Sequence, residues 1–136
     1  MKILVIANST IPVPPRLYGG SQRMVFNLCK GLNTRKISVN LLSCKGSQTF
    51  MGKTLNYVDY RFGTSILGRC LSWAEFQVQC MRLIKDVDLV HSSILLPERL
   101  FSLNKFKKPI IYKHGNTPKS NDFRRIIKAN PKRGFL

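Results

Sequence analysis

One stretch decides how this chain is organised: Pro14-Pro15-Arg16-Leu17-Tyr18-Gly19-Gly20-Ser21-Gln22-Arg23. It lies between an apolar run, residues 3–7, and an amphipathic segment, residues 22–33. A strand that ends in a glycine turn and enters a helix leaves free backbone N–H groups at the positive end of the helix dipole. Gly19 and Gly20 can adopt positive φ and allow a ligand to approach closely, while Ser21 can cap the helix. The stretch predicts an anion site suited to phosphate, with a simple tight turn as the alternative.

The segments around this loop predict a parallel sheet. Residues 2–7 are continuously apolar, which is typical of a central strand buried on both faces. Apolar positions in residues 22–33 recur at helical spacing, and residues 36–43 follow as a second strand. A strand, a helix and a strand in this order form one parallel crossover unit.

The same alternation continues along the chain. Residues 55–62 predict a weaker strand, and residues 66–85 a helix whose apolar side chains cover more than one face, so that we expect it to be largely buried. Trp73 and Phe76 of this helix are expected in the core. Further elements are predicted at residues 88–91 (strand), 96–104 (helix), 109–113 (strand) and 122–129 (short helix). We therefore predict an α/β fold with a Rossmann-like, doubly wound parallel sheet.

Length and charge limit the function. The chain has 136 residues, enough for one domain with a substantial core. Its 23 basic and 6 acidic side chains give a net charge of +17, which predicts attraction to nucleic acid, an anionic membrane surface or phosphorylated small molecules. The basic residues concentrate after residue 104. They form either a solvated surface or a surface that docks on anionic lipid, and the sequence leaves both interpretations open. Because they are not interleaved with aromatic residues, no nucleic-acid partner is expected.

Neither metal chemistry nor secretion is indicated. Cys29, Cys44, Cys70 and Cys80 form no Cys-x-x-Cys pair, and with only two histidines they suggest buried free thiols rather than a zinc or redox site. The amino-terminal apolar run is too short for the core of a signal peptide. No stretch approaches the roughly 20 apolar residues that span a bilayer. We expect a cytoplasmic location.

The glycine loop differs from the common nucleotide fingerprints. It lacks the Gly-x-Gly-x-x-Gly spacing, and the second strand ends Leu41-Leu42-Ser43-Cys44 without an acidic residue to bind ribose. A Walker A motif is also absent, which argues against a dinucleotide cofactor and P-loop chemistry. His114, after the last clear strand, can reach a substrate hydroxyl or phosphate at the carboxyl ends of the strands, with a packing role as the alternative. His91, inside a short strand, is expected to be structural.

The order of these landmarks resembles a known family. Met1-Lys2-Ile3-Leu4-Val5-Ile6, then Pro14-Pro15-Arg16 and Gly19-Gly20-Ser21-Gln22-Arg23, and a helix ending Gly31-Leu32 look like the amino-terminal half of the family 4 glycosyltransferases of the GT-B fold. Val87-Asp88-Leu89-Val90-His91 and Lys108-Pro109-Ile110-Ile111-Tyr112-Lys113-His114-Gly115 are similar to two later landmarks of that half. The resemblance covers residues 1–116, which we expect to form the acceptor-side domain. Residues 117–136 are a basic tail, which we expect to be the start of the rest of that domain.

The resemblance implies retaining transfer of a sugar from a nucleotide-sugar donor to a saccharide or lipid-linked acceptor. By analogy, Arg16, Gly19, Gly20 and Ser21 belong to a substrate-binding loop that reaches the donor diphosphate, and His114 is the candidate residue near the donor sugar. No metal and no cofactor are implied, because the nucleotide sugar is a co-substrate. Peripheral association with the inner face of the membrane is a further expectation.

The chain also departs from the family pattern. The second domain, with its Glu-x7-Glu type motif, is absent from these residues, so the chain is not expected to transfer sugar alone. We expect either a fragment or a partner chain that supplies the donor domain. The alternative is a non-enzymatic Rossmann-like module that binds a phosphorylated ligand or an anionic surface.

Overall fold

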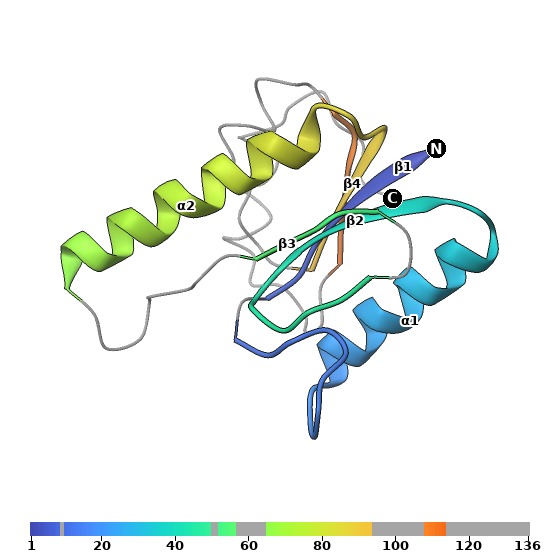
Figure 1. Ribbon diagram of the computed structural model, residues 1–136, viewed down its shortest axis with the longest axis horizontal. Coiled ribbons are helices and arrows are strands. Elements are labelled where there is room, and N and C mark those ends of the chain that lie inside the picture. Colours follow the sequence, from blue (N-terminus) through green and yellow to red (C-terminus); the bar gives the residue numbers. More distant parts are fainter. Residues whose placement is uncertain (9, 50–51, 57–64, 94–107, 114–136) are drawn as a thin grey trace, which may run out of the picture.

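The computed structural model describes residues 1–8, 10–49, 52–56, 65–93 and 108–113 (Figure 1). In chain order its elements are β1 (Lys2–Ile6), α1 (Gly20–Thr34), β2 (Ser38–Ser43), β3 (Thr54–Asn56), α2 (Ile66–Ile84), β4 (Leu89–Ser92) and β5 (Ile110–Tyr112). Each overlaps an element that the sequence pattern predicts, and β3 covers only the start of the strand predicted at residues 55–62. The predicted helices at residues 96–104 and 122–129, the later part of the third predicted strand, and the tail from residue 117 lie outside the described residues.

The described strands form one parallel sheet in the order β3-β2-β1-β4-β5. β1 is its central strand and pairs with both neighbours, since Ile3 lies opposite Val39 of β2 and opposite Leu89 of β4. Residues 3–6 of β1 are all buried. A strand covered on both faces needs no polar alternation, which explains the continuous apolar run. The α/β, Rossmann-like prediction is confirmed.

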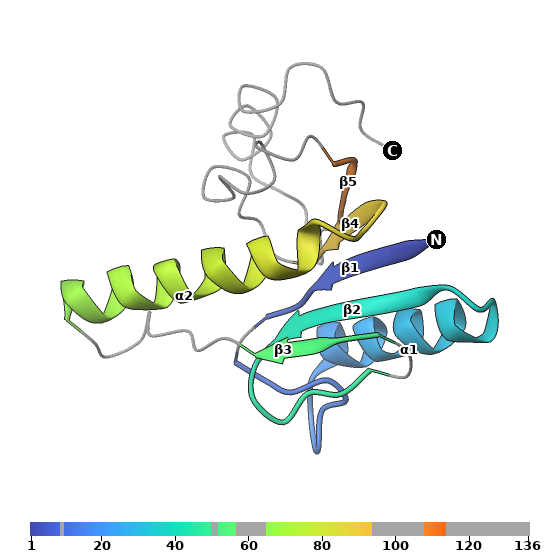
Figure 2. The ribbon, with the colours of Figure 1, turned by 45° about the horizontal axis from the view of Figure 1, so that its top comes forward.

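Successive side chains of β1 enter two separate cores. Ile3 and Val5 pack in the core that contains Cys29 of α1, whereas Leu4 and Ile6 pack in the core that contains Cys80 of α2. Because neighbouring residues of a strand point to opposite faces, α1 and α2 cover opposite faces of the sheet, as Figure 2 shows. This arrangement is the doubly wound form that the sequence predicts.

The side of β1 on which new strands are added changes once along the chain. From β1 it passes to β2 and then β3 on one side, and β4 and β5 are added on the other side of β1. The connections that leave β1 and β4 therefore diverge at the carboxyl ends of these two strands. In open α/β sheets such a switch point leaves a crevice in which ligands bind.

The loop after β2 holds the proline loop in place. The Val13 N–H donates to Ser47 Oγ at 2.9 Å, and the Gln48 N–H donates to the Val13 carbonyl at 2.7 Å. The Val13 side chain is fully buried in the core beneath α1. These contacts hold the chain at Val13, ahead of the glycines at the start of α1.

Gly52, just before β3, occupies a position that only glycine fits. Its φ of +116° lies in the left-handed region, and a Cβ there would overlap the carbonyl oxygen of Val39. The next residue explains the close approach: the Lys53 N–H donates to Asn40 Oδ1 at 2.9 Å, and its carbonyl accepts from the Leu41 N–H at 2.8 Å. Gly52 therefore allows β3 to join the edge of β2.

The prediction that α2 is largely buried is wrong for its amino-terminal half. Phe76 is in the core, with 4% of its surface exposed, but Trp73 is 46% and Leu67 68% exposed. The helix has 19 residues and is roughly 28 Å long, whereas the longest strand has six residues and spans about 20 Å. α2 therefore extends beyond the sheet at its amino-terminal end (Figure 1). Neither helix in the described part of the chain is long and apolar enough to cross a bilayer.

The four cysteines are free thiols, but they are not all buried. Cys29 and Cys80 lie in the two cores, Cys44 is half-buried, and Cys70 is exposed on α2. The expectation of buried thiols is therefore wrong for Cys70, because this residue lies on the part of α2 that extends past the sheet.

Candidate functional site

The glycine loop delivers the chain directly into α1. Gly19 is the N-cap residue, with an extended φ of 161°, and Gly20 is the first residue of the helix. Neither uses the left-handed conformation that the sequence allowed. Ser21 is the second helical residue, and no side-chain hydrogen bond caps this helix, so the prediction that Ser21 is the cap is wrong. The helix starts at Gly20, and the capping position falls on Gly19 instead.

The two glycines have different structural roles. A Cβ on Gly19 would approach Pro15 Cβ to 3.0 Å and Gln22 Oε1 to 3.1 Å, so Gly19 lets the loop pack closely on the helix. A Cβ on Gly20 would meet no atom within 4 Å. The space beside Gly20 is open, and a ligand can reach the backbone there.

The amino end of α1 has the properties of an anion site. Its first intrahelical hydrogen bond runs from the Arg23 N–H to the Gly19 carbonyl at 2.9 Å. The helix therefore provides no acceptor for the N–H groups of Gly20, Ser21 and Gln22. No acidic side chain lies in the first turn to neutralise the positive end of the helix dipole.

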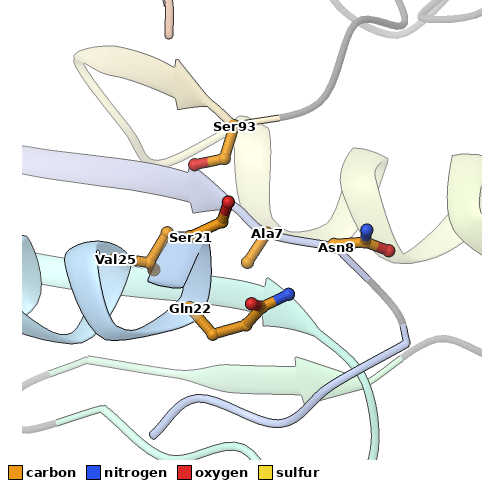
Figure 3. A pocket seen from close by; sticks show the side chains of 6 residues that line it. All are labelled: Ala7, Asn8, Ser21, Gln22, Val25 and Ser93. Atoms are coloured by element: carbon orange, nitrogen blue, oxygen red, sulfur yellow. The ribbon is translucent and has the colours of Figure 1, made fainter. Parts of the chain in front are cut away.

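A pocket lies beside this helix end, at the switch point of the sheet (Figure 3). Its volume is about 80 Å³, small enough for one compact group rather than a complete nucleotide. It is lined by the end of β1, the first turns of α1 and the residue after β4: Ala7, Asn8, Ser21, Gln22, Val25 and Ser93. The glycine loop and the carboxyl ends of β1 and β4 thus meet at one place, as expected for this sheet topology.

Ser93 contributes a hydroxyl to the pocket from a distant part of the sequence. Its N–H donates to the Ile6 carbonyl at 2.9 Å, which fixes Ser93 beside the end of β1. Its Oγ is shielded from solvent and has no hydrogen-bond partner among the residues that the structure describes. A buried polar atom in this state is available to a ligand.

The predicted site residues are only partly brought together. Ser21 lines the pocket, and Gly19 and Gly20 precede it at the same helix end. Arg16 is exposed on the loop and does not line the pocket. His114 lies outside the described residues.

The pocket also includes residues that the sequence reasoning did not select, namely Asn8, Gln22 and Ser93. Asn8 and Ser93 each follow the end of a parallel strand. That position is the one signal in the sequence that could have identified them.

His91 is the histidine that lies within the described residues. His91 is on β4, two residues before Ser93, and its Nδ1 is buried without a partner in the described part of the chain. Its pKa lies below the ordinary value of 6.5, first because burial disfavours the charged imidazolium and second because the Lys113 ammonium repels it. His91 is therefore neutral at pH 7. Its expected structural role stays a prediction.

Metal-ligating side chains do not gather in the described ranges. Within residues 1–8, 10–49, 52–56, 65–93 and 108–113, no three His, Cys, Asp or Glu side chains lie close enough together to hold a metal ion.

These features define a Rossmann-like α/β protein with a small polar pocket at the switch point of its sheet. Comparison with models of known families and with curated protein sequences gives no match. Among solved structures, the chain is similar to the C-terminal domain of PF1911 hydrogenase from Pyrococcus furiosus. The TM-score is 0.56 at 15% identity over 83% of this chain and 91% of that one, a likeness of fold alone.

A second similar structure is that of a glycosyltransferase. The chain is similar to AviGT4, a glycosyltransferase involved in avilamycin A biosynthesis, with a TM-score of 0.53 and 26% identity over 85% of this chain. The match covers 32% of AviGT4, so this chain spans about a third of that protein. The chain therefore has a glycosyltransferase-like Rossmann fold.

Proposed function

We propose that this chain is the acceptor-side, amino-terminal domain of a retaining glycosyltransferase of the GT-B fold, of the family 4 type. The observation that carries the proposal is the pocket between the ends of β1 and β4 and the amino end of α1, in a chain 26% identical to a glycosyltransferase. A helix amino terminus without acidic neighbours favours a diphosphate over a neutral group.

Each residue of the loop takes a role that follows from its position. The N–H groups of Gly20, Ser21 and Gln22 bind one phosphoryl group of the nucleotide sugar, while Gly19 keeps the loop packed against the helix. Arg16 is exposed on the same loop, so its flexible guanidinium can meet a ligand that enters from solvent. The role of His114 near the donor sugar comes from the family resemblance. In this proposal hydrogen bonds and the helix dipole stabilise the diphosphate without a metal.

A donor-binding half is needed to complete the enzyme. The chain matches about a third of AviGT4. In this proposal the residues that bind the nucleotide are therefore supplied by a further domain or by a separate chain. The net charge of +17 also favours an anionic membrane surface, where a lipid-linked acceptor would be found. We therefore propose peripheral attachment at the cytoplasmic face, with a saccharide or lipid-linked acceptor.

A titration of the ¹⁵N-labelled chain tests the binding step. UDP-glucose, ADP-glucose and GDP-mannose are added in turn, with uridine, adenosine and guanosine as controls that lack phosphate. We expect at least one nucleotide sugar to shift the amide signals of Gly20, Ser21 and Gln22, and the nucleosides to leave them unchanged. Equal shifts from a nucleotide sugar and its nucleoside, or no shift at the start of α1, would contradict the proposal.

A second measurement separates the enzyme from a binding module. The chain is combined with the carboxyl-terminal part of AviGT4, which this chain does not match, and release of nucleoside diphosphate is measured with saccharide and lipid-linked acceptors. Binding of the nucleotide sugar without any release would favour the non-enzymatic alternative.

A further inference from the structure

A group of polar side chains faces α1 at the carboxyl ends of β4 and β5. Leu89 packs against the core beneath α1, and Val90 belongs to the core beneath α2. Because strand side chains alternate, His91 and Ser93 face α1 as Leu89 does. Tyr112 pairs with Ser92, so the next residue, Lys113, follows beside Ser93. Its N–H donates to the Ser92 carbonyl at 3.0 Å.

The side chain of Lys113 connects β5 with the start of α1. Its Nζ donates to the Sδ atom of Met24 at 3.0 Å, between residues 89 positions apart in the sequence. Met24 is three residues after Ser21, so both lie on the same side of the helix. The Lys113 ammonium therefore lies beside the first turns of α1, on the side from which Ser21 lines the pocket.

The hydrogen bonds of this group are incomplete. A thioether sulfur is a weak acceptor and carries no charge to balance an ammonium. Ser93 Oγ and His91 Nδ1 are both buried without a partner in the part of the chain that the structure describes. Two such atoms two residues apart leave hydrogen-bonding capacity here that a polar ligand or an ordered water can satisfy. His91 is neutral here, so the positive charge of the group is that of Lys113.

We propose that Lys113 and Ser93 bind the second phosphoryl group of the diphosphate that the proposed function assigns to this site. One phosphoryl group binds the N–H groups at the amino end of α1. The second accepts hydrogen bonds from Ser93 Oγ and from Lys113 Nζ, whose ammonium turns from Met24 to the phosphate. This inference rests on the proposed function, because it extends the same anion site. The pocket alone holds only one compact group, and Lys113, which follows β5 at the position beside Ser93, is the nearest cation that the strand register supplies.

The test compares inorganic pyrophosphate with inorganic phosphate by isothermal titration calorimetry at constant ionic strength. Wild-type protein should bind pyrophosphate more tightly. Lys113→Met should weaken pyrophosphate binding roughly tenfold or more, the effect expected for loss of a charge-assisted hydrogen bond, and Lys113→Arg should retain most of it. Lys108→Met is the matched control, because it removes the same charge at the opposite end of β5. It should change the affinity less than twofold, since its charge is remote and screened.

Ser93→Ala provides a second variant with a different readout. Its Oγ has no partner in the described part of the ligand-free chain, so its removal should leave the urea midpoint unchanged or slightly higher. Pyrophosphate affinity should nevertheless fall several-fold. A large loss of stability in Ser93→Ala would indicate a structural role and overturn the assignment of Ser93.

The outcomes distinguish this inference from the proposed function. If pyrophosphate binds and Gly20→Asp abolishes binding, but Lys113→Met has no effect or an effect equal to that of Lys108→Met, binding of the second phosphoryl group by Lys113 is refuted and the helix site stands. Equal wild-type affinities for phosphate and pyrophosphate also refute it. If neither anion shifts the amide signals of Gly20, Ser21 and Gln22, the anion site of the proposed function itself fails.

Discussion

Gly20→Asp places a carboxylate at the point where the proposed anion binds. A Cβ at Gly20 would meet no atom within 4 Å, so the side chain fits without moving its neighbours. Replacing a helical glycine by alanine gains about 0.5–1 kcal/mol, and aspartate, a weaker helix former, gains less, but an acidic residue in the first turn adds about 0.3–1 kcal/mol. The folded state should therefore be as stable as wild type, or slightly more stable.

The effect on binding should be far larger than the effect on stability. Two unit charges about 5 Å apart at an effective dielectric constant near 20 repel by roughly 3 kcal/mol. This repulsion lowers pyrophosphate affinity roughly 100-fold, because about 1.4 kcal/mol corresponds to a factor of ten. The assay is calorimetric titration with pyrophosphate, with urea unfolding of the same sample.

Gly31→Asp is the matched control for this variant. Gly31 is also in α1 and also faces open space. It is 11 residues after Gly20, about 16 Å along the helix, which exceeds the Debye length of about 10 Å at 0.1 M salt. Gly31→Asp should therefore bind pyrophosphate almost as wild type does. Unchanged binding by Gly20→Asp, or an equal loss in both variants, would refute a phosphate site at the start of α1.

The remaining predictions concern the fold and its titrating groups. Gly52→Ala should lower the free energy of unfolding by more than about 1 kcal/mol, because the residue has positive φ and the added Cβ would overlap the Val39 carbonyl; an unchanged urea midpoint would show that this turn is not constrained. Cys70 should react with iodoacetamide at pH 8 before Cys29 does, as mapped by mass spectrometry. Burial raises the pKa of Cys29 to about 11, so that roughly one Cys29 side chain in a thousand is a thiolate at pH 8. Equal labelling of the two cysteines would contradict the burial of Cys29. The folded state should lose stability as the pH falls below 6.5 toward the lowered pKa of His91, because the unfolded chain then binds the proton more tightly. The slope of this loss is at most about 1.4 kcal/mol per pH unit. A His91→Gln variant with the same slope between pH 7 and 5 would rule out His91 as the cause.

Local sequence determined the elements and much of the fold. The continuous apolar run at residues 2–7 predicted a central strand, and β1 is that strand because both of its faces are covered. The regular alternation of strands and helices predicted the parallel sheet. The glycine loop was correctly placed at the start of a helix, although the capping position is Gly19 rather than Ser21. Periodicity and turn residues act between near neighbours, so they can be recognised without knowledge of the fold.

Tertiary structure decided what surrounds that loop. Ser93 reaches the pocket only because β4 pairs with β1. Lys113 reaches Met24 only because β5 pairs with β4, on the same side of β1. The exposure of Trp73 was likewise invisible in the helical pattern, since it depends on how far α2 extends beyond the strands. Local backbone geometry, which can be read from the glycine loop, therefore predicts the position of the helix end that we propose as the anion site. The side chains that complete the pocket were decided by strand order, which joins residues far apart in the chain.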